Sequence, residues 1–406
     1  MGLLQAQTPD SLILRFKTIN SAVAESSAAT GRGRLVSNRA MNVFLSEAAG
    51  YYLSAPDDLT LYKNSVIADA AEGTLAIYHN LRQPAGIDER VRSFLSIGTK
   101  ANVADAFTAA HEGRRYNNRF GLLVKQTWIG NGSTTYSESQ KKMMDALRAG
   151  ILHSIEGEIR RKAADLEASL DSWDPGRDVP GQDVAVAKNI ARQKFNADLQ
   201  AEYEFEFARR QSETLARTFN YGVVAVNWTS ISLYAPLVTE NFITVPDSNA
   251  AHTERHAYPL HVNLTHTRLW EGSRFGRLYL SLAGDLSMNN SRDGYALDRF
   301  LADDLYIGGY RNFITPALKG QVIYVPRDSH IGISFALQQN FGSYHALNGT
   351  LGFPIVLINK KAEPSVNFEF QVRLFDIGNQ LEPRSGLPGK TSVGLTMGVP
   401  FSKIAF

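Results

Sequence analysis

A row of alternating apolar and polar side chains over residues 277–289 constrains the fold of this chain more than any other feature of its sequence. The apolar positions are Leu278, Leu280, Leu282, Leu286 and Met288, with Gly284 in the one gap. Such a strand has one apolar and one polar face, and burying both faces would strip the polar row of its water. The pattern is typical of a membrane-spanning barrel strand, with lipid on one side and a polar interior on the other.

The same alternation recurs through residues 219–406 and, more weakly, through residues 66–135. Turn-forming Gly, Pro and Asn residues separate the alternating segments. Eight segments after residue 219 and three before residue 135 read as strands. A fourth early strand is expected within residues 40–70 or 104–117, because an even number returns the chain to the side from which it entered. The sequence therefore predicts a mainly β fold, an antiparallel transmembrane β-barrel of about twelve strands.

Residues 136–218 interrupt this pattern with apolar side chains at every third or fourth position. Asp174, Pro175 and Gly176 divide the segment into two runs of about 36 residues, each roughly 54 Å long if helical. Two equal runs around a Pro/Gly turn predict a long antiparallel α-helical hairpin inserted into the barrel. The hairpin either packs only on itself or also docks a partner. In the second case the expected partner-contact residues are Ile155, Ile159, Trp173, Phe195, Tyr203 and Phe207.

Residues 1–65 form an N-terminal extension that is expected to be either a plug or the first strand. Residues 38–52 have the helical spacing of a short helix. Residues 1–6 are similar to the end of a secretory signal peptide whose charged start is missing, and a cytosolic N-terminus is the alternative.

The lengths of the connections predict the orientation of the barrel. Counting back from Phe406, the long connections near residues 236–257, 289–317 and 378–390 fall on one side, and most short turns fall on the other. In outer-membrane barrels the short turns and the C-terminus lie in the periplasm. The helical hairpin enters the strand that begins near residue 219 from the short-turn side, and it is therefore expected in the periplasm.

The polar face of the strands predicts the lining of the barrel. The expected lumen-facing residues are His261, Asn263, Arg277, Asp285, Glu369 and Arg373. A barrel of this size is narrow enough for such side chains either to line a pore or to close it. His266 is expected on the lipid side, so it cannot share a metal ion with His261. Aromatic residues near strand ends are expected to form the girdle at the membrane interface, namely Trp128, Tyr234, Trp270, Tyr306, Tyr310 and Tyr324.

Catalytic and cofactor-binding signals are weak in this sequence. Walker, dinucleotide-binding, nucleophile-elbow and His-Glu-x-x-His motifs are missing from it. The chain contains no cysteine, which excludes disulfides, cysteine-ligated metals and cysteine nucleophiles. The formal charge of +2 predicts no strong attraction to nucleic acid. We therefore expect no enzyme activity, no cofactor, no metal site and no nucleic-acid partner.

Long alternating strands, a strand that reaches the C-terminus and the terminal Phe406 together resemble Gram-negative outer-membrane β-barrel proteins. The resemblance covers roughly residues 70–130 and 219–406, and the style of the sequence is similar to barrels from Bacteroidota. It implies a location in the outer membrane, and an assembly signal formed by Phe401 and Phe406. Because Phe406 is out of phase with the apolar row that ends at Phe401, a β-bulge is expected near Pro400.

Several functions fit this fold. A scaffold barrel within an envelope-spanning or secretion-type assembly fits the long hairpin, which would contact protein partners in the periplasm or outer membrane. The alternative is a passive channel or small-solute transporter, which fits the polar lumen. A barrel enzyme and a soluble two-domain β protein fit fewer features.

Overall fold

The computed structural model describes most of the chain, namely residues 8–26, 31–50, 62–69, 74–81, 88–102, 111–112, 115–116, 120–173, 184–237, 240–245, 253–290, 298–299, 305–307, 311–342, 345–358, 364–380 and 391–404. The signal-like residues 1–6 and the terminal Phe406 lie outside them, and so does the Tyr310 that was expected in the girdle.

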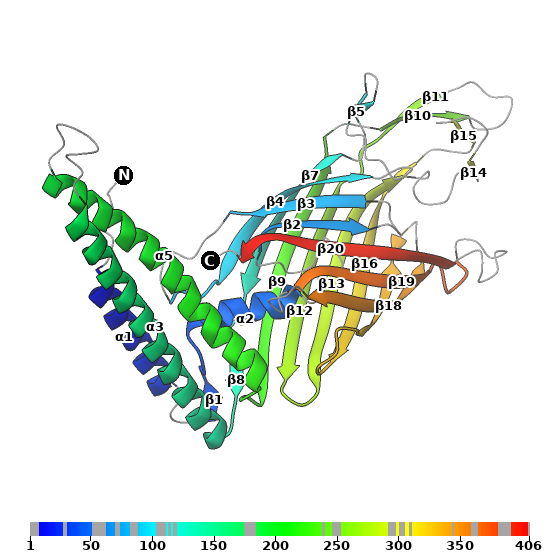
Figure 1. Ribbon diagram of the computed structural model, residues 1–406. Coiled ribbons are helices and arrows are strands. Elements are labelled where there is room, and N and C mark those ends of the chain that lie inside the picture. Colours follow the sequence, from blue (N-terminus) through cyan, green and yellow to red (C-terminus); the bar gives the residue numbers. More distant parts are fainter. Residues whose placement is uncertain are drawn as a thin grey trace.

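Twelve antiparallel strands form a closed barrel (Figure 1), which confirms the predicted fold. Pairing of Gly121 with Pro236 and of Ile129 with Trp228 joins the last strand of the ring to the first. Four strands precede the helical insert and eight follow it, and the expected fourth early strand is β2. The ring runs in the order β9 (Val223–Pro236), β12 (His261–Gly272), β13 (Gly276–Asn290), β16 (Asn312–Pro326), β17 (Ile333–Asn340), β18 (Leu347–Ile358), β19 (Pro364–Leu374), β20 (Thr391–Ile404), β2 (Tyr62–Asp69), β3 (Thr74–Asn80), β4 (Ser93–Asn102) and β7 (Gly121–Ile129).

Side chains alternate between the two faces of the barrel wall. On β13, Leu280, Leu282 and Leu286 point outward and are about half exposed, whereas Tyr279 and Ala283 point inward and are buried. Period-two alternation of this kind follows from the pleat of the strand. The apolar row of residues 277–289 is therefore the outer face of β13.

The two ends of the barrel differ in their connections. Gly272 pairs with Val223 and Gly276 with Pro326, so the short β12–β13 turn and the start of β9 lie at one end. This end carries the helical insert, and we call it the rod end. At the opposite end, the longer connections carry the short strands β5 (His111–Glu112), β6 (Arg115–Tyr116), β10 (Glu240–Val245), β11 (Thr253–Ala257), β14 (Asp298–Arg299) and β15 (Leu305–Ile307).

The helical insert consists of α3 (Glu138–Ser172) and α5 (Val184–Thr218), and α1 (Pro9–Ser26) packs alongside both. Ser137 and Gln140 form a capping box that fixes the start of α3. We call these three helices the rod. It leaves the β9 side of the barrel and runs obliquely to the strands (Figure 1). Within the described residues, no helix combines the length and the apolar character needed to cross a membrane.

Three further elements complete the rod end. Helix α2 (Asn38–Gly50) lies at this end of the barrel (Figure 1), and the short strands β1 (Arg32–Gly33) and β8 (Ser133–Thr135) extend the sheet beside β9. On the last strand, Phe401 pairs with Asn64 and Ile404 with Tyr62. Between these two pairs, two residues of β20 face one residue of β2, so the expected bulge lies just beyond Pro400.

Candidate functional site: the closed end of the barrel and the rod

Helix α2 is packed inside a ring of apolar side chains at the rod end. Its inner face contributes Val43, Phe44, Leu45 and Ala48, all buried. The ring comes from inward positions near the rod end of six neighbouring strands and from Val91. It includes Val91, Phe94, Ile129, Val224, Val226, Trp228, Leu269, Tyr279, Ile323 and Val325. Because these side chains form one buried cluster with α2, the helix closes this end of the barrel as a plug.

Specific contacts fix α2 in the ring. The Tyr279 hydroxyl, on β13, donates a hydrogen bond to the backbone carbonyl of Ala48 near the end of the helix. The Phe44 ring meets the Tyr221 ring edge-on, with 6.0 Å between centroids. Edge-to-face aromatic pairs add about 0.5–1.5 kcal/mol to the burial of their area. The C-terminal half of α2 is therefore attached to the barrel wall and to the segment that enters β9.

Asp88, in the β3–β4 connection, caps the first turn of α2. Its Oδ1 accepts hydrogen bonds from the backbone N–H groups of Asn38 (2.6 Å) and Arg39 (3.4 Å). Burial raises the pKa of the Asp88 carboxyl, and these backbone donors and Arg34 oppose that shift. A carboxylate at a helix N-terminus satisfies orphan N–H groups and complements the helix dipole. Asp88 thus holds the start of α2 against the barrel rim.

The same end of α2 is docked onto the rod. The side-chain oxygen of Gln211 on α5 accepts a buried 2.9 Å hydrogen bond from the backbone N–H of Ser37. Arg39 forms a 3.0 Å ion pair with Glu204, also on α5, and both side chains are largely buried. Met144, Ala208 and Leu215 at the rod base belong to the same apolar cluster as the plug. The plug and the rod base are therefore one packed unit.

Arg148 ties α1 to this unit. Its side chain is 1% exposed and donates to Asn20 on α1 (3.0 Å), to the Leu35 carbonyl (2.7 Å) and to Asp145 (2.5 Å). Burial lowers the pKa of Arg148, and Asp145 opposes the shift. A buried guanidinium needs partners for its donors, and here each of the three nitrogens of Arg148 donates one hydrogen bond.

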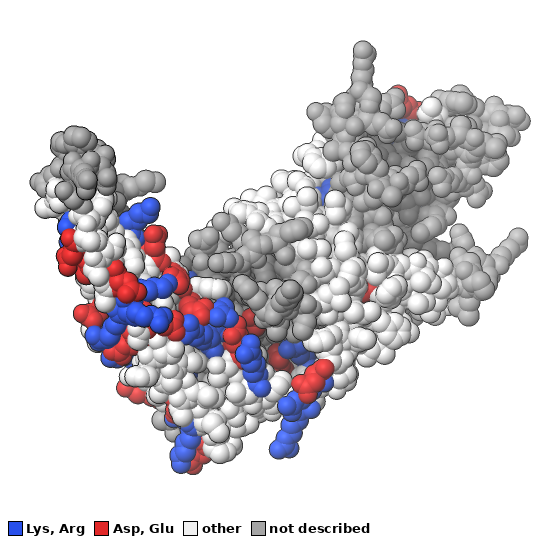
Figure 2. Space-filling view, viewed as in Figure 1, with Lys and Arg blue, Asp and Glu red and all other residues white. Residues whose placement is uncertain are grey.

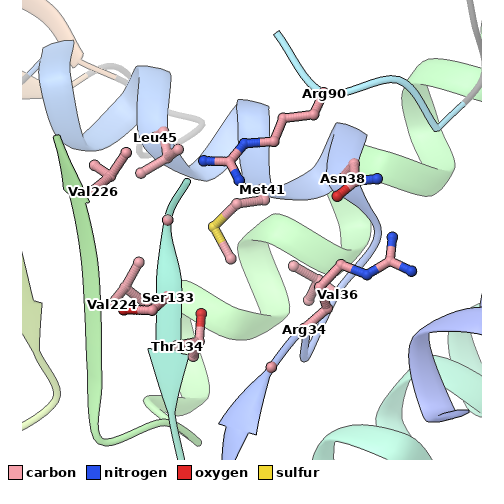
Figure 3. Close-up of a pocket in the computed structure, with 12 residues that line it drawn as sticks. Arg34, Val36, Asn38, Met41, Leu45, Arg90, Ser133, Thr134, Val224 and Val226 are labelled. Carbon is pink, nitrogen blue, oxygen red and sulfur yellow. The ribbon is translucent and has the colours of Figure 1, made fainter. Parts of the chain in front are cut away.

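A small cavity remains between α2, β1, β8 and β9 (Figure 3). Its volume is roughly 50 Å³, enough for only a few water molecules. Met41 points into it from α2, and Arg34, Ser133 and Val226 contribute to its walls. The cavity is a packing gap in the seal and is too small for an organic ligand.

The residues predicted for the lumen lie on the inner face of the barrel. Asp285 accepts hydrogen bonds from Asn263 (2.5 Å) and contacts the His261 ring (3.0 Å). Glu369 accepts hydrogen bonds from Ser334 and from Gln371, which in turn accepts from Arg373. Each of these groups is paired with side chains of the barrel itself.

The inner face carries little solvent-accessible surface. Inward polar residues on many strands are nearly fully buried, among them Ser65, Ser96, Thr127, Ser230, Asn263, Glu369 and Thr396. Side chains along a water-filled pore would keep accessible area. The interior is therefore filled around these residues, and of the two alternatives, an open pore or a closed lumen, they favour the closed lumen. No three metal-ligating side chains come together in the described parts of the chain.

The residues expected to contact a partner on the hairpin lie mostly inside the rod. Ile155, Ile159, Tyr203 and Phe207 are buried against Leu12, Ile13, Phe16, Ile19 and Val23 of α1, with Phe195 packed beside them. The Phe16 and Phe207 rings stack with 4.5 Å between centroids. The expectation that these four residues form an exposed docking face is therefore wrong, because α1 of the same chain covers them. Trp173, at the end of α3, is 37% exposed.

Charged side chains of both signs cover the rod surface (Figure 2), and ion pairs between them make the stability of the rod depend on pH. Arg210 joins Glu206 on its own helix to Glu158 on α3, each at 2.7 Å. Hydrogen bonds from Arg209 and Arg210 lower the pKa of Glu206 from 4.5 to about 2. A lowered folded-state pKa stabilises the fold above the unfolded value, and this contribution is lost as pH falls from 4.5 towards 2.

We therefore expect the helical melting transition of the rod to move to lower temperature between pH 6 and pH 3, measured by circular dichroism. Glu206→Gln should weaken this shift, because it removes the titrating group while keeping the size of the side chain. Glu25→Gln, outside this ion-pair network, is the matched control and should melt like the wild type at both pH values. Equal pH dependence in wild type and Glu206→Gln would contradict the assignment.

Three features of this site escaped the sequence reading. The packing of α1 on the hairpin was missed, although Leu12, Ile13, Phe16, Ile19 and Val23 have helical spacing. Residues 38–52 were expected to be helical and a plug was one alternative for residues 1–65, but that this helix is itself the plug was not predicted. Tyr234, expected in the girdle, instead packs inward against the cluster around Tyr78 and Leu123. Trp128, Trp270 and Tyr324 do lie in the outward phase of their strands.

Comparisons with known proteins add little to this geometry. No protein-family model matches the chain, and no curated protein sequence matches it. Among solved structures, the chain is similar to the beta domain of the Bordetella autotransporter Brka, with 6% identity and a TM-score of 0.30. The match covers 83% of this chain and 98% of that domain. The barrel assignment rests on the strand pairing described above.

Proposed function

We propose that this protein is an outer-membrane barrel that anchors its rod, and that the rod contacts partner proteins in the periplasm. In this proposal the protein is a scaffold component of an envelope-spanning or secretion-type assembly and has no catalytic role. The observation that carries the proposal is the combination of a filled, plugged barrel with a rod fixed rigidly to it.

The outer surface of the barrel supports a membrane location. Outward side chains of successive strands are apolar and between about one-third and one-half exposed. They include Leu264, Leu282, Val322, Phe335, Phe353 and Phe370. An apolar band on the outside of a closed barrel is what lipid contact requires. The charged residues seen in Figure 2 gather on the rod instead.

The rod tip supports the partner role. Beyond the part covered by α1, the apolar side chains Val184, Val186 and Ile190 in the first two turns of α5 are exposed, and so is Trp173, which caps the end of α3. Ile190 is 60% exposed. Large apolar side chains exposed together on a helical surface mark contact sites in many proteins.

A co-purification experiment tests the scaffold role. The double variant Val186→Ser/Ile190→Ser should lose, by about tenfold or more, the envelope proteins that crosslink to and co-purify with the wild type. Met143→Ser is the matched control, because Met143 is also exposed on the rod but lies near its base. Heat-modifiable migration on gels would show that both variants keep the barrel. Equal recovery of the same proteins with the tip variant would refute the role of the tip.

A passive channel is the second candidate, since the inner face of the barrel is polar. The plug and the buried inner side chains oppose it. Planar-bilayer recording separates the two functions: the wild type should be electrically silent, and steady ion conductance by the intact fold would favour the channel.

A further inference from the structure

The apolar outer face of the barrel is interrupted on β9 and β12. Leu264 and Ile231 pair across these strands and continue the apolar band. Two steps further towards the rod end the outward pair is His266 with Thr229, and after it comes Arg268 with Asn227. On the neighbouring β13, the residues in register with His266 and Arg268 are Leu282 and Leu280. The polar patch is therefore local to β9 and β12.

The patch lies at the level of outward aromatic residues. Trp270 is the next outward residue after Arg268, and Trp128 on β7 pairs with Thr229. The Arg268 guanidinium lies over the Trp270 ring, 4.9 Å from its centroid. Aromatic girdles mark the boundary between hydrocarbon and headgroups. Arg268 is thus placed at headgroup depth in the leaflet nearer the rod, where an arginine on the lipid face costs only about 0–1 kcal/mol.

A break in the sheet hollows the patch into a pocket. Strand β9 exchanges its neighbour β7 for β8 between Trp228 and Ala225, and the connection from Gly130 to Gly132 leaves a gap there. The resulting pocket has a volume of roughly 140 Å³. Its polar lining consists of Asn131, Ser133, Asn227, His266 and Arg268.

The charge in this pocket is unbalanced. None of the residues that line it is acidic. Within the described residues Arg268 has no carboxylate partner, and the nearest glutamate on its strand, Glu271, is inward and paired with Arg277 at 3.0 Å. The His266 ring contacts the Thr229 hydroxyl at 2.9 Å. Amide and hydroxyl donors around one guanidinium form a site for a tetrahedral oxyanion.

We propose that this pocket binds the phosphate group of an anionic phospholipid in the leaflet nearer the rod. The Arg268 guanidinium contacts the phosphate oxygens, and Asn131, Asn227 and Ser133 supply further donors. Trp128, on the hydrocarbon side of Arg268, lies beside the acyl chains, and Trp270, on the rod side, lies beside the headgroup. The site rests on the membrane location in the proposed function but not on the partners of the rod.

Native mass spectrometry of the detergent-purified chain tests the site with defined probes. Titration with phosphatidylglycerol should give one tightly retained lipid per chain, whereas diacylglycerol with the same acyl chains should not be retained. Arg268→Gln should weaken retention about tenfold. Arg274→Gln is the matched control, because Arg274 is exposed in the adjacent β12–β13 turn, and it should retain lipid like the wild type.

Any of three other results would contradict the proposal that a lipid phosphate binds in this pocket. Equal retention by wild type and Arg268→Gln would show that the phosphate does not bind there. Displacement of the lipid by millimolar inorganic phosphate would assign the pocket to free phosphate. A photocrosslinker at position 268 that captures a protein in intact envelopes would make the patch a protein interface. Resistance of the barrel to carbonate extraction is scored separately, so the membrane location can stand when the lipid site fails.

Discussion

Replacing Arg148 with methionine is expected to lower the free energy of unfolding of the rod by about 3 kcal/mol and to release α1 from its base. The methionine fills most of the volume but offers no donor. The Leu35 carbonyl then remains buried without its 2.7 Å hydrogen bond, and Asn20 loses its link to α3. Buried acceptors that lose their donor cost about 1–3 kcal/mol each.

Limited proteolysis provides the measurement, since a short segment of the chain joins the end of α1 at Ser26 to β1 and the plug helix α2. Cleavage near residues 27–34 should become at least tenfold faster in Arg148→Met, while heat-modifiability shows that the barrel is intact. Arg161→Met is the control, because Arg161 is exposed on the same helix. Unchanged cleavage in Arg148→Met would mean that apolar packing around Phe16 and Phe207 alone holds α1.

The barrel could be predicted because every second side chain of its strands faces the lipid and the others face the interior, so that apolar and polar residues alternate in the sequence. On β13 and β19 the apolar row and the polar row are continuous, and each maps onto one face of the wall. Parity of the strand count also required a fourth early strand. Its sequence, Tyr62–Asp69, mixes polar and apolar residues and gives little alternation by itself.

A plug was one of two alternatives for residues 1–65, and the sequence could not decide between them, because the strands around a plug show it only as a loss of alternation. At the start of β9 the inward positions Val224, Val226 and Trp228 are as apolar as an outward row. A strand that is apolar on both faces does not show in its sequence which face is inward, and its periodicity does not identify what fills the space inside the barrel. The matching apolar face of α2 lies about 180 residues earlier in the chain, and only the fold brings the two together.

The rod illustrates the same limit. The spacing of Ile155, Ile159, Tyr203 and Phe207 correctly marked an apolar stripe, but a stripe does not identify what covers it. Here α1 of the same chain does so over the middle of the rod. The exposed tip around Ile190 therefore replaces the buried stripe as the surface offered to a partner.

Replacing Phe44 with alanine is expected to loosen the plug by about 3 kcal/mol, within the range for truncating a buried phenylalanine. The Phe44 ring is 3% exposed and contacts Tyr221, so its removal leaves a cavity between α2 and the barrel entrance. A loss of about 3 kcal/mol raises the population of the displaced plug roughly a hundredfold. Local opening of this kind is read out by the accessibility of a buried group.

A single thiol can report that opening, because the chain has no cysteine of its own. Ser46→Cys is close to isosteric and lies fully buried in α2, where Ser46 makes only local hydrogen bonds within the helix. Maleimide should label this thiol slowly in the otherwise unchanged chain and about a hundredfold faster when Phe44→Ala is added. Met143→Ala, an exposed apolar truncation on α3, is the control and should leave the rate unchanged. Fast labelling without the Phe44 change would show that α2 does not seal the barrel, because the seal requires Ser46 to be inaccessible while the helix is in place.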